Sequence, residues 1–241
     1  MKKLVLGSLM AVVVSQAAGC IISSGDEDAV ITANWSLKQQ ATGQTISCPP
    51  STTTAAIYAQ AVDLDFRPIG SPFIDLFDCN DNTGRTAPLP PDVYQVWVQL
   101  ESEGGGTKYA TSLSAFVDVI DQDKTFTTTI LNDGGYFQFD WDLVDAGNNA
   151  PLTCAQIAEI GGVGAVSTSV ANNTMFFDDK FDCEDGTGIT AGLLQGAYTV
   201  AIDALDRSDR SISPAPTTLT NRIIGDRNQV TDLGTVVVRV N

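Results

Sequence analysis

The sequence predicts an all-β protein built from two tandem Greek-key β-sandwiches. Short stretches rich in Val, Ile, Thr, Phe and Tyr alternate with clusters of Gly, Pro, Asn and Asp, which is the pattern of strands separated by turns. After residue 28, no stretch shows the 3.6-residue apolar period of a long helix. The chain also repeats itself with a shift of about 105 residues, which indicates tandem copies of one folding unit.

Each copy contains about six predicted strands, a number that suits a Greek-key sandwich with a disulfide and a buried tryptophan. In the first copy we expect strands at Ala29–Leu37, Ala55–Asp63, Phe73–Cys79, Val93–Leu100, Tyr109–Val119 and Phe126–Leu131. In the second copy we expect strands at Tyr136–Leu143, Val163–Val170, Met175–Cys183, Ala197–Ala204, Ile212–Leu219 and Val230–Val240. The segment Leu152–Ile160 is expected to hold one helical turn capped by Thr153.

The two copies share landmarks at matching offsets. In each copy a tryptophan stands 13 residues before a cysteine, an eight-residue segment identical at six positions contains a second cysteine, and a tyrosine follows that cysteine by 15 residues. The landmarks are Trp35, Cys48, Phe77–Gly84 and Tyr94 in the first copy, and Trp141, Cys154, Phe181–Gly188 and Tyr198 in the second. This internal duplication predicts one β-sandwich over residues 29–132 and another over residues 133–241.

The repeat also predicts how four of the five cysteines pair. Each copy has two cysteines in matching places, and each copy has to fold by itself. Of the three possible pairings, this favours Cys48–Cys79 and Cys154–Cys183. Each bond would close a loop of about 30 residues and stabilise the fold by roughly 3–4 kcal/mol, in an oxidising compartment. The alternative is one metal ion held by all four thiolates, although the chain has no CxxC spacing.

Trp97 is the first choice for the centre of a binding face. Trp35 and Trp141 match between the copies and are expected to fill the two cores. Trp97 instead matches Ala201. Alternation along the strand turns one set of side chains inward and the other outward: Tyr94, Val96, Val98 and Leu100 against Gln95, Trp97 and Gln99. An outward tryptophan can stack on a sugar ring or a partner side chain. Of the two interpretations, the favoured one is that a neighbouring loop or the second copy covers Trp97, because single exposed aromatic residues are common; Trp97 is the first choice if the protein has a binding face.

The segment Leu193-Leu194-Gln195-Gly196-Ala197-Tyr198 places a tyrosine after a turn that carries a leucine. It resembles the corner of immunoglobulin-like and prealbumin-like sandwich modules in bacterial surface proteins, such as carboxypeptidase-regulatory-like and Cna-B-like domains. The first copy departs from this signature, with Asp92 where the second has Gly196. The resemblance implies that each tyrosine hydroxyl bonds to nearby backbone. As a whole, the chain is similar to bacterial lipoproteins of unassigned activity that carry such modules.

The first 28 residues are predicted to be an export signal and a tether. Two lysines precede the apolar run Leu4–Val14, which is too short to span a bilayer. Ala17-Ala18-Gly19-Cys20 resembles the lipobox of bacterial lipoproteins, with Ala17 in place of the usual leucine. The resemblance implies a signal peptide over residues 1–19, diacylglycerol on Cys20 and a flexible acidic tether over residues 20–28. The alternative is ordinary secretion with cleavage nearby.

The sorting of this lipoprotein is predicted from the residue that follows the lipidated cysteine. In the resembled family, Asp at that position retains a lipoprotein in the inner membrane. Ile21 therefore favours the outer membrane of a Gram-negative cell, on either its periplasmic or its outer side.

Composition excludes several classes of function. The chain has 13 Lys and Arg against 29 Asp and Glu, so its net charge of -16 repels nucleic acid. It has no histidine, which removes Ser-His-Asp catalysis, imidazole proton transfer and His-ligated metals. No phosphate-binding glycine loop, GxSxG or HExxH motif is present. We therefore expect a protein that is not an enzyme, needs no cofactor, and binds an envelope or surface protein or glycan.

Two other functions stay open. Carboxylates crowd the second repeated turn and make weak calcium candidates, although their spacing is not that of an EF-hand and turns select Asp and Gly for backbone reasons. These candidates are Asp178, Asp182, Glu184 and Asp185. With Trp97 they support a calcium-dependent or carbohydrate-binding adhesin as the alternative. A hydrolase with acidic catalytic residues in a groove between the copies is less favoured, since no acid stands in an apolar segment.

Overall fold

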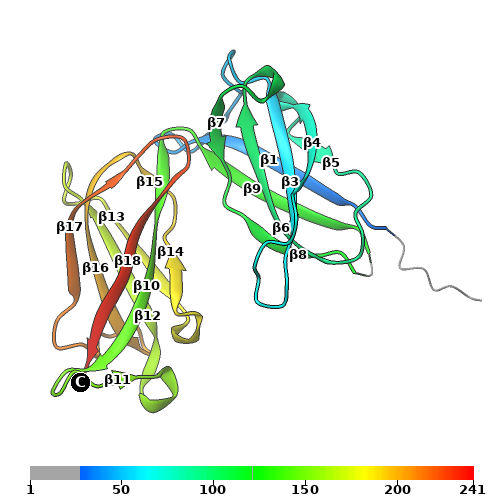
Figure 1. Ribbon diagram of the computed structural model, residues 1–241. Helices are drawn as coiled ribbons and strands as arrows, with labels where there is room; N and C mark the ends of the chain where they lie inside the picture. Colours follow the sequence, from blue (N-terminus) through cyan, green and yellow to red (C-terminus); the bar gives the residue numbers. More distant parts are fainter. Residues whose placement is uncertain (1–27, 121) are drawn as a thin grey trace, which may run out of the picture.

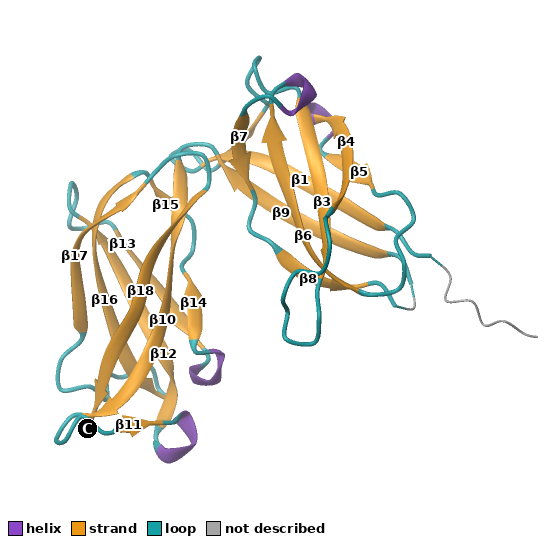
Figure 2. Ribbon diagram, viewed as in Figure 1, coloured by secondary structure: helices purple, strands orange, loops and turns teal. Residues whose placement is uncertain are grey.

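The computed structural model describes residues 28–120 and 122–241. The predicted signal peptide, Cys20 and the tether up to residue 27 lie outside these ranges. Within them the chain forms two β-sandwiches in tandem, with only short 3₁₀ turns besides (Figures 1 and 2). The prediction of an all-β protein made of tandem sandwiches is confirmed. No helix long and apolar enough to cross a bilayer occurs in the described residues.

Strands β1 to β9 form the first sandwich. One sheet contains β1 (Ile31–Gln39), β2 (Gln44–Ile46), β5 (Thr83–Arg85) and β9 (Lys124–Leu131). The other has the order β4-β3-β6, with β7 and β8 both on the free side of β6: β3 (Thr54–Ala61), β4 (Phe73–Asp78), β6 (Val93–Glu101), β7 (Lys108–Thr111) and β8 (Ala115–Asp118).

Strands β10 to β18 form the second sandwich on the same plan. One sheet contains β10 (Gly134–Asp145), β11 (Pro151–Leu152), β14 (Thr187–Ile189), β15 (Leu193–Leu194) and β18 (Gln229–Val240). The other has the order β13-β12-β16-β17: β12 (Ile160–Ser169), β13 (Phe176–Phe181), β16 (Gly196–Asp206) and β17 (Thr217–Ile224). The 3₁₀ turns are η1 (Cys79–Asp81), η2 (Glu103–Gly105), η3 (Cys154–Gln156) and η4 (Cys183–Asp185).

In each sandwich the first and last long strands pair in parallel. β1 pairs with β9 over Ile31–Lys38, and β10 pairs with β18 over Gly135–Asp145. The first and last long strands of each sandwich therefore lie side by side in one sheet of that sandwich. The inward side chains of these strands contribute to two separate cores. The residues of the first core fall between Ala29 and Ile130 in the sequence, and those of the second fall between Phe137 and Val240.

Matching residues occupy matching places in the two cores. Trp35 and Trp141 are both buried, and the Trp35 indole donates a hydrogen bond to the Cys79 carbonyl at 2.9 Å. The buried Tyr94 hydroxyl donates to Pro90 O at 2.9 Å, and Tyr198 donates to Leu194 O at 3.0 Å. The expectation that each tyrosine hydroxyl bonds to nearby backbone is confirmed in both copies.

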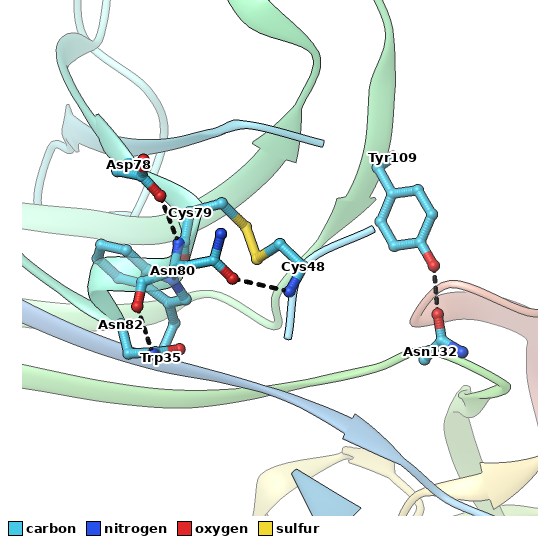
Figure 3. The surroundings of a disulfide bond; sticks show 8 residues. All are labelled: Trp35, Cys48, Asp78, Cys79, Asn80, Asn82, Tyr109 and Asn132. Carbon is cyan, nitrogen blue, oxygen red and sulfur yellow. Dashed lines mark hydrogen bonds between the residues drawn. A yellow bond between two sulfur atoms is a disulfide. The ribbon is translucent and has the colours of Figure 1, made fainter. Parts of the chain in front are cut away.

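Both disulfides are formed within their own sandwich, as the repeat predicts. Cys48 bonds to Cys79 with the Cα atoms 6.2 Å apart, and Cys154 bonds to Cys183 with the Cα atoms 5.9 Å apart. Figure 3 shows the first bond, with Cys48 N also donating to Asn80 Oδ1 at 3.1 Å. The alternative of one metal ion held by four thiolates is wrong, because these sulfurs are bonded in pairs.

The helical turn predicted after Leu152 is present as η3. Thr153 stands at its N-cap, and its backbone N–H donates to the Gln156 side chain at 2.8 Å. Two predicted strands are wrong. Tyr109–Val119 is broken into β7 and β8, since the Ser112 hydroxyl accepts the Val98 N–H that a strand carbonyl would accept. The strand predicted at Ile212–Leu219 begins only at Thr217, because Pro214 and Pro216 have no N–H to pair.

The sandwiches meet at one end and are inclined to each other (Figure 1). Only Asn132 and Asp133 lie between β9 and β10. Asp133 accepts backbone N–H groups of Gln40 and Ala41, and Asn132 accepts the hydroxyl of Tyr109 (Figure 3). These side-chain contacts fix the short link against the first sandwich.

Candidate binding surface

The outer face of sheet β4-β3-β6 carries an aromatic pair. Alternation in β6 buries Val96 and Val98 and leaves Trp97 half-buried on the outer face, as predicted. Tyr58 lies directly opposite Trp97 on β3. The two rings stack, with centroids 4.9 Å apart and planes 8° apart. A single strand pair therefore presents a double ring on the outside of the sandwich.

Exposed apolar side chains extend this pair on both sides. Ile74, 50% exposed, stands opposite Tyr58 on β4, and Leu76, 59% exposed, stands opposite Ala56. On the other side Phe116 of β8 lies opposite Gln95 and is also exposed. We call this surface the aromatic face; it consists of Tyr58, Ile74, Leu76, Trp97 and Phe116. Contiguous exposed apolar surface of this kind marks interaction sites in soluble proteins.

The second sandwich shows that the fold does not require this surface. The register of β12, β13 and β16 places Val166 opposite Ala201 and Asp178, where the first copy has Tyr58 between Trp97 and Ile74. Lys180 takes the place of Leu76 and forms an ion pair with Asp209. At the positions that correspond to Tyr58, Trp97, Ile74 and Leu76, the second copy of the same scaffold thus has smaller or charged side chains.

Polar side chains border the rings. Gln95 Nε2 donates to Ser114 Oγ at 2.9 Å, and Gln99 Nε2 donates to Glu101 Oε2 at 2.7 Å. Burial, followed by the nearby charge of Glu101, raises the pKa of the Tyr58 hydroxyl above its ordinary value. The phenol therefore remains a neutral donor and acceptor at physiological pH.

A groove of about 350 Å³ lies where the two sandwiches meet, and Trp97 forms part of its wall. The first sandwich contributes Trp97, Gln95 and the segment Thr111–Ser114, and the second contributes Gln138, Ile189 and Val230. Sequence reasoning identified Trp97 alone. Tyr58 could have been found from the alternation of its own strand. Covering of Trp97 by the second copy was expected as one possibility, but the sequence does not indicate that residues of β10, β14 and β18 provide it.

Three of the four acidic calcium candidates lie in one turn, and the fourth lies on a strand. Asp178 lies on the outer face of β13, while Asp182 caps η4 and accepts the Glu184 N–H at 3.3 Å. Glu184 and Asp185 belong to that turn itself. Across residues 28–120 and 122–241, no three acidic, cysteine or histidine side chains converge in a way that could hold a metal ion.

The repeated eight-residue segment is explained by the turn it builds. Asp78 caps η1 by accepting the Asn80 N–H at 2.8 Å, and Asn82 ends the turn in the left-handed region at φ 58° (Figure 3). Gly84 then faces the Phe77 ring so closely that a Cβ atom there would lie 2.6 Å from it. The repeated Asp78, Phe77 and Gly84 thus have structural roles in shaping this turn.

A second cavity, of about 400 Å³, lies on the outer face of the second sandwich. Asp178, Asp203 and the Lys180–Asp209 ion pair line it. A glycosidase pairs one ionised carboxylate with an acid whose pKa is raised. Burial raises the pKa of Asp179, but that side chain alternates to the other face of β13 and accepts the Ala191 N–H at 3.0 Å. Asp179, the carboxyl group whose pKa is raised, therefore holds a loop and does not line this cavity.

The fold places this chain among all-β proteins of two tandem sandwiches, and comparisons give only distant similarity. No protein-family model and no curated protein sequence matches the chain. A minor pilin of Streptococcus agalactiae is 12% identical with a TM-score of 0.31, over 88% of this chain and 96% of the pilin.

Two other solved structures are similar to a comparable degree. A fimbrial anchor protein of Porphyromonas gingivalis is 10% identical with a TM-score of 0.29, over 80% of this chain and 82% of its own. A leucine-rich repeat protein of Bacteroides thetaiotaomicron is 10% identical with a TM-score of 0.39, over 89% of this chain and 26% of its own. Similarity at this level carries no functional conclusion, which has to come from the residues of this chain.

Proposed function

We propose that the protein is a non-catalytic cell-envelope lipoprotein that binds a partner through the aromatic face of its first sandwich. Residues 1–19 act as the signal peptide, lipid on Cys20 anchors the chain to the outer membrane, and residues 20–28 are the tether. The two modules, residues 29–132 and 133–241, then extend from the membrane as a bent pair.

The observation that carries this proposal is the difference between the two copies. Where the first has Tyr58, Trp97, Ile74 and Leu76, the second has Val166, Ala201, Asp178 and Lys180. Since the second sandwich is built on the same plan without them, the apolar side chains of the first are not needed for folding. Exposed aromatic and aliphatic residues that the fold does not need favour a binding role.

The chemistry of the remaining surface supports binding rather than catalysis. Asp179, whose pKa is raised, anchors a loop by accepting the Ala191 N–H. The net charge of -16 disfavours anionic partners such as nucleic acid. A lipid anchor with two or three acyl chains would provide lasting membrane attachment without a transmembrane helix.

The binding proposal is tested by capture from envelope extracts with the lipid-free chain from Ser23 onward. A partner retained by the wild-type chain should be lost with the double variant Tyr58→Ala/Trp97→Ala. The matched control is Phe176→Ala, which removes a 63% exposed aromatic from the second sandwich. Equal capture by all three proteins, or none by the wild type, contradicts the proposal.

The anchor is tested separately by Cys20→Ser. The wild-type protein should label with radioactive palmitate and enter the detergent phase on Triton X-114 partition, because its acyl chains bury methylene groups. The variant should lose both properties. If the variant partitions as the wild type does, attachment does not depend on lipid at this residue.

A further inference from the structure

We propose that the ligand of this protein is a neutral glycan, held in the groove between the two sandwiches with one sugar ring stacked on Trp97. This inference deepens the proposed function and rests on it. It concerns the groove rather than the whole aromatic face, and it assigns a role to residues of the second sandwich.

The groove is preformed by contacts that fix one sandwich against the other. Asn228, only 3% exposed, accepts the Leu131 N–H at 2.6 Å and donates to the Thr111 carbonyl at 2.8 Å. The Arg227 guanidinium lies over the Tyr109 ring, 5.1 Å from its centroid. Thr111 is itself part of the groove wall, so the loop before β18 directly holds that wall in place. A preformed site avoids the entropy cost of ordering both modules on binding.

The strand break between β7 and β8 shapes the first wall. Because Ser112 replaces a ladder carbonyl with its hydroxyl, β7 ends at Thr111 and β8 starts at Ala115. The intervening residues, of which Ser114 is exposed and bonds to Gln95, line the groove beside Trp97. At the break, side-chain hydroxyl groups therefore line the groove, where an uninterrupted strand would continue the backbone hydrogen bonds to β6.

The groove is uncharged in a strongly acidic protein. Although 17% of the residues are charged and the net charge is -16, none of the nine side chains that line this groove carries a charge. Its polar side chains are amides and hydroxyls, among them Gln95, Ser114 and Gln138. An anionic ligand would find no counter-charge and would be repelled by the whole molecule. These properties select a neutral ligand rich in hydroxyl groups.

An aromatic ring among amides matches the two surfaces of a sugar. The C–H face of a pyranose is apolar and packs on an indole, while its rim of hydroxyls both donates and accepts hydrogen bonds. Trp97 offers the ring, and the amides of Gln95 and Gln138 offer paired donors and acceptors on opposite walls. The volume of about 350 Å³ is near the lower end for small-ligand sites, roughly 300–1,000 Å³, and fits a short segment of a longer glycan.

The experiment measures affinity for neutral and anionic polysaccharides. The protein, purified in a detergent without a sugar headgroup, is titrated with dextran, laminarin, galactomannan and hydroxyethylcellulose, and with alginate and polygalacturonate. We expect binding to at least one neutral polymer and to neither anionic one. Trp97→Ala on the first wall and Ile189→Ser on the second should each weaken that binding, the former by about tenfold or more. Trp97→Phe should restore part of it.

The matched control is Leu76→Ser. Leu76 is exposed on the same sheet and belongs to the aromatic face, but it does not line the groove. This variant should bind the polysaccharide as the wild type does, and melting temperatures show that each variant is folded. Equal losses for Leu76→Ser and Trp97→Ala, or stronger binding of alginate, overturn the inference.

The outcomes also separate this inference from the function on which it rests. If no neutral polysaccharide binds while an envelope protein is captured in a Trp97-dependent way, the glycan inference is overturned and the proposed binding face stands. If neither ligand depends on Trp97, both are wrong.

Discussion

The indole of Trp97 stacks on the phenol of Tyr58 across two neighbouring strands, on the face of the sheet that points away from the core. Such a pair contributes about 0.5–1.5 kcal/mol beyond the area that it buries. Trp97→Ala should therefore lower the free energy of unfolding by about 1–2 kcal/mol. Trp35→Ala should cost about 3–5 kcal/mol, because its indole is enclosed in the core. Urea unfolding followed by circular dichroism measures both.

A loss of several kcal/mol for Trp97→Ala would contradict its placement on the outer face. The comparison between the two variants is the safeguard, since both remove the same side chain and differ only in where it lies. Equal costs would mean that Trp97 belongs to a core.

The close approach of Gly84 to Phe77 gives a second prediction. In Gly84→Ala the new methyl group would lie 2.6 Å from the ring, so the ring or the β1–β5 pairing has to move. We expect a loss of about 1–3 kcal/mol in the stability of the first sandwich. Gly188→Ala should do the same in the second sandwich, where a Cβ atom would lie 2.9 Å from Phe181.

Gly106→Ala is the control for this pair, because Gly106 has an ordinary φ of -73° and is exposed. Its thermal midpoint should stay close to that of the wild type. If Gly84→Ala is as stable as the wild type, the close packing of Gly84 against Phe77 does not explain why both copies have a glycine at this position.

The features that the sequence predicts are those carried by local chemistry or by the duplication. The disulfide pairs follow from the symmetry of the two copies. The hydrogen bonds of the Tyr94 and Tyr198 hydroxyls follow from a turn that places the backbone carbonyl of the residue four positions earlier within reach of each hydroxyl. Alternation correctly directs Trp97 outward, because inward and outward positions in a strand differ by one residue.

The remaining features depend on contacts between segments that are distant in the sequence. Nothing in β1 or β9 marks them as parallel partners, since a parallel and an antiparallel strand can have the same side chains. The break at Ser112 depends on a hydroxyl that meets Val98 from the next strand. The groove depends on Asn228 reaching Thr111 across 117 residues. The sequence could therefore suggest that the second copy covers Trp97, but not which of its residues form the second wall.

The third prediction concerns the independence of the two disulfides. The double variant Cys154→Ala/Cys183→Ala opens a loop of 29 residues in sequence separation and should destabilise the second sandwich by roughly 3–4 kcal/mol. The first sandwich keeps its own core and bond, so its unfolding transition should change little. Calorimetry of the wild type and the variant resolves the two transitions. If the variant loses the same amount of stability in both sandwiches, they unfold as one cooperative unit.

The last prediction concerns acid stability and the loop between β16 and β17. Asp206 accepts the backbone N–H of Arg210 at 3.0 Å and its guanidinium at 2.7 and 2.9 Å, and these bonds lower the pKa of the carboxyl from 3.8 to about 2. Because the folded-state pKa lies below the unfolded value, the carboxylate stabilises the fold above pH 3.8, and this contribution is lost as the pH falls toward 2.

Asp206→Asn should therefore lower the melting temperature at pH 5, and its difference from the wild type should shrink between pH 4 and pH 2. Arg210→Ala removes only the guanidinium, so the Asp206 pKa should rise part of the way back toward 3.8. The variant should therefore be less stable than the wild type at pH 5, and it should lose less stability than the wild type between pH 4 and pH 2. Thermal melts at half-unit steps from pH 5 to pH 2 measure all three proteins. A difference between wild type and Asp206→Asn that stays constant over this range would show that Asp206 does not titrate there.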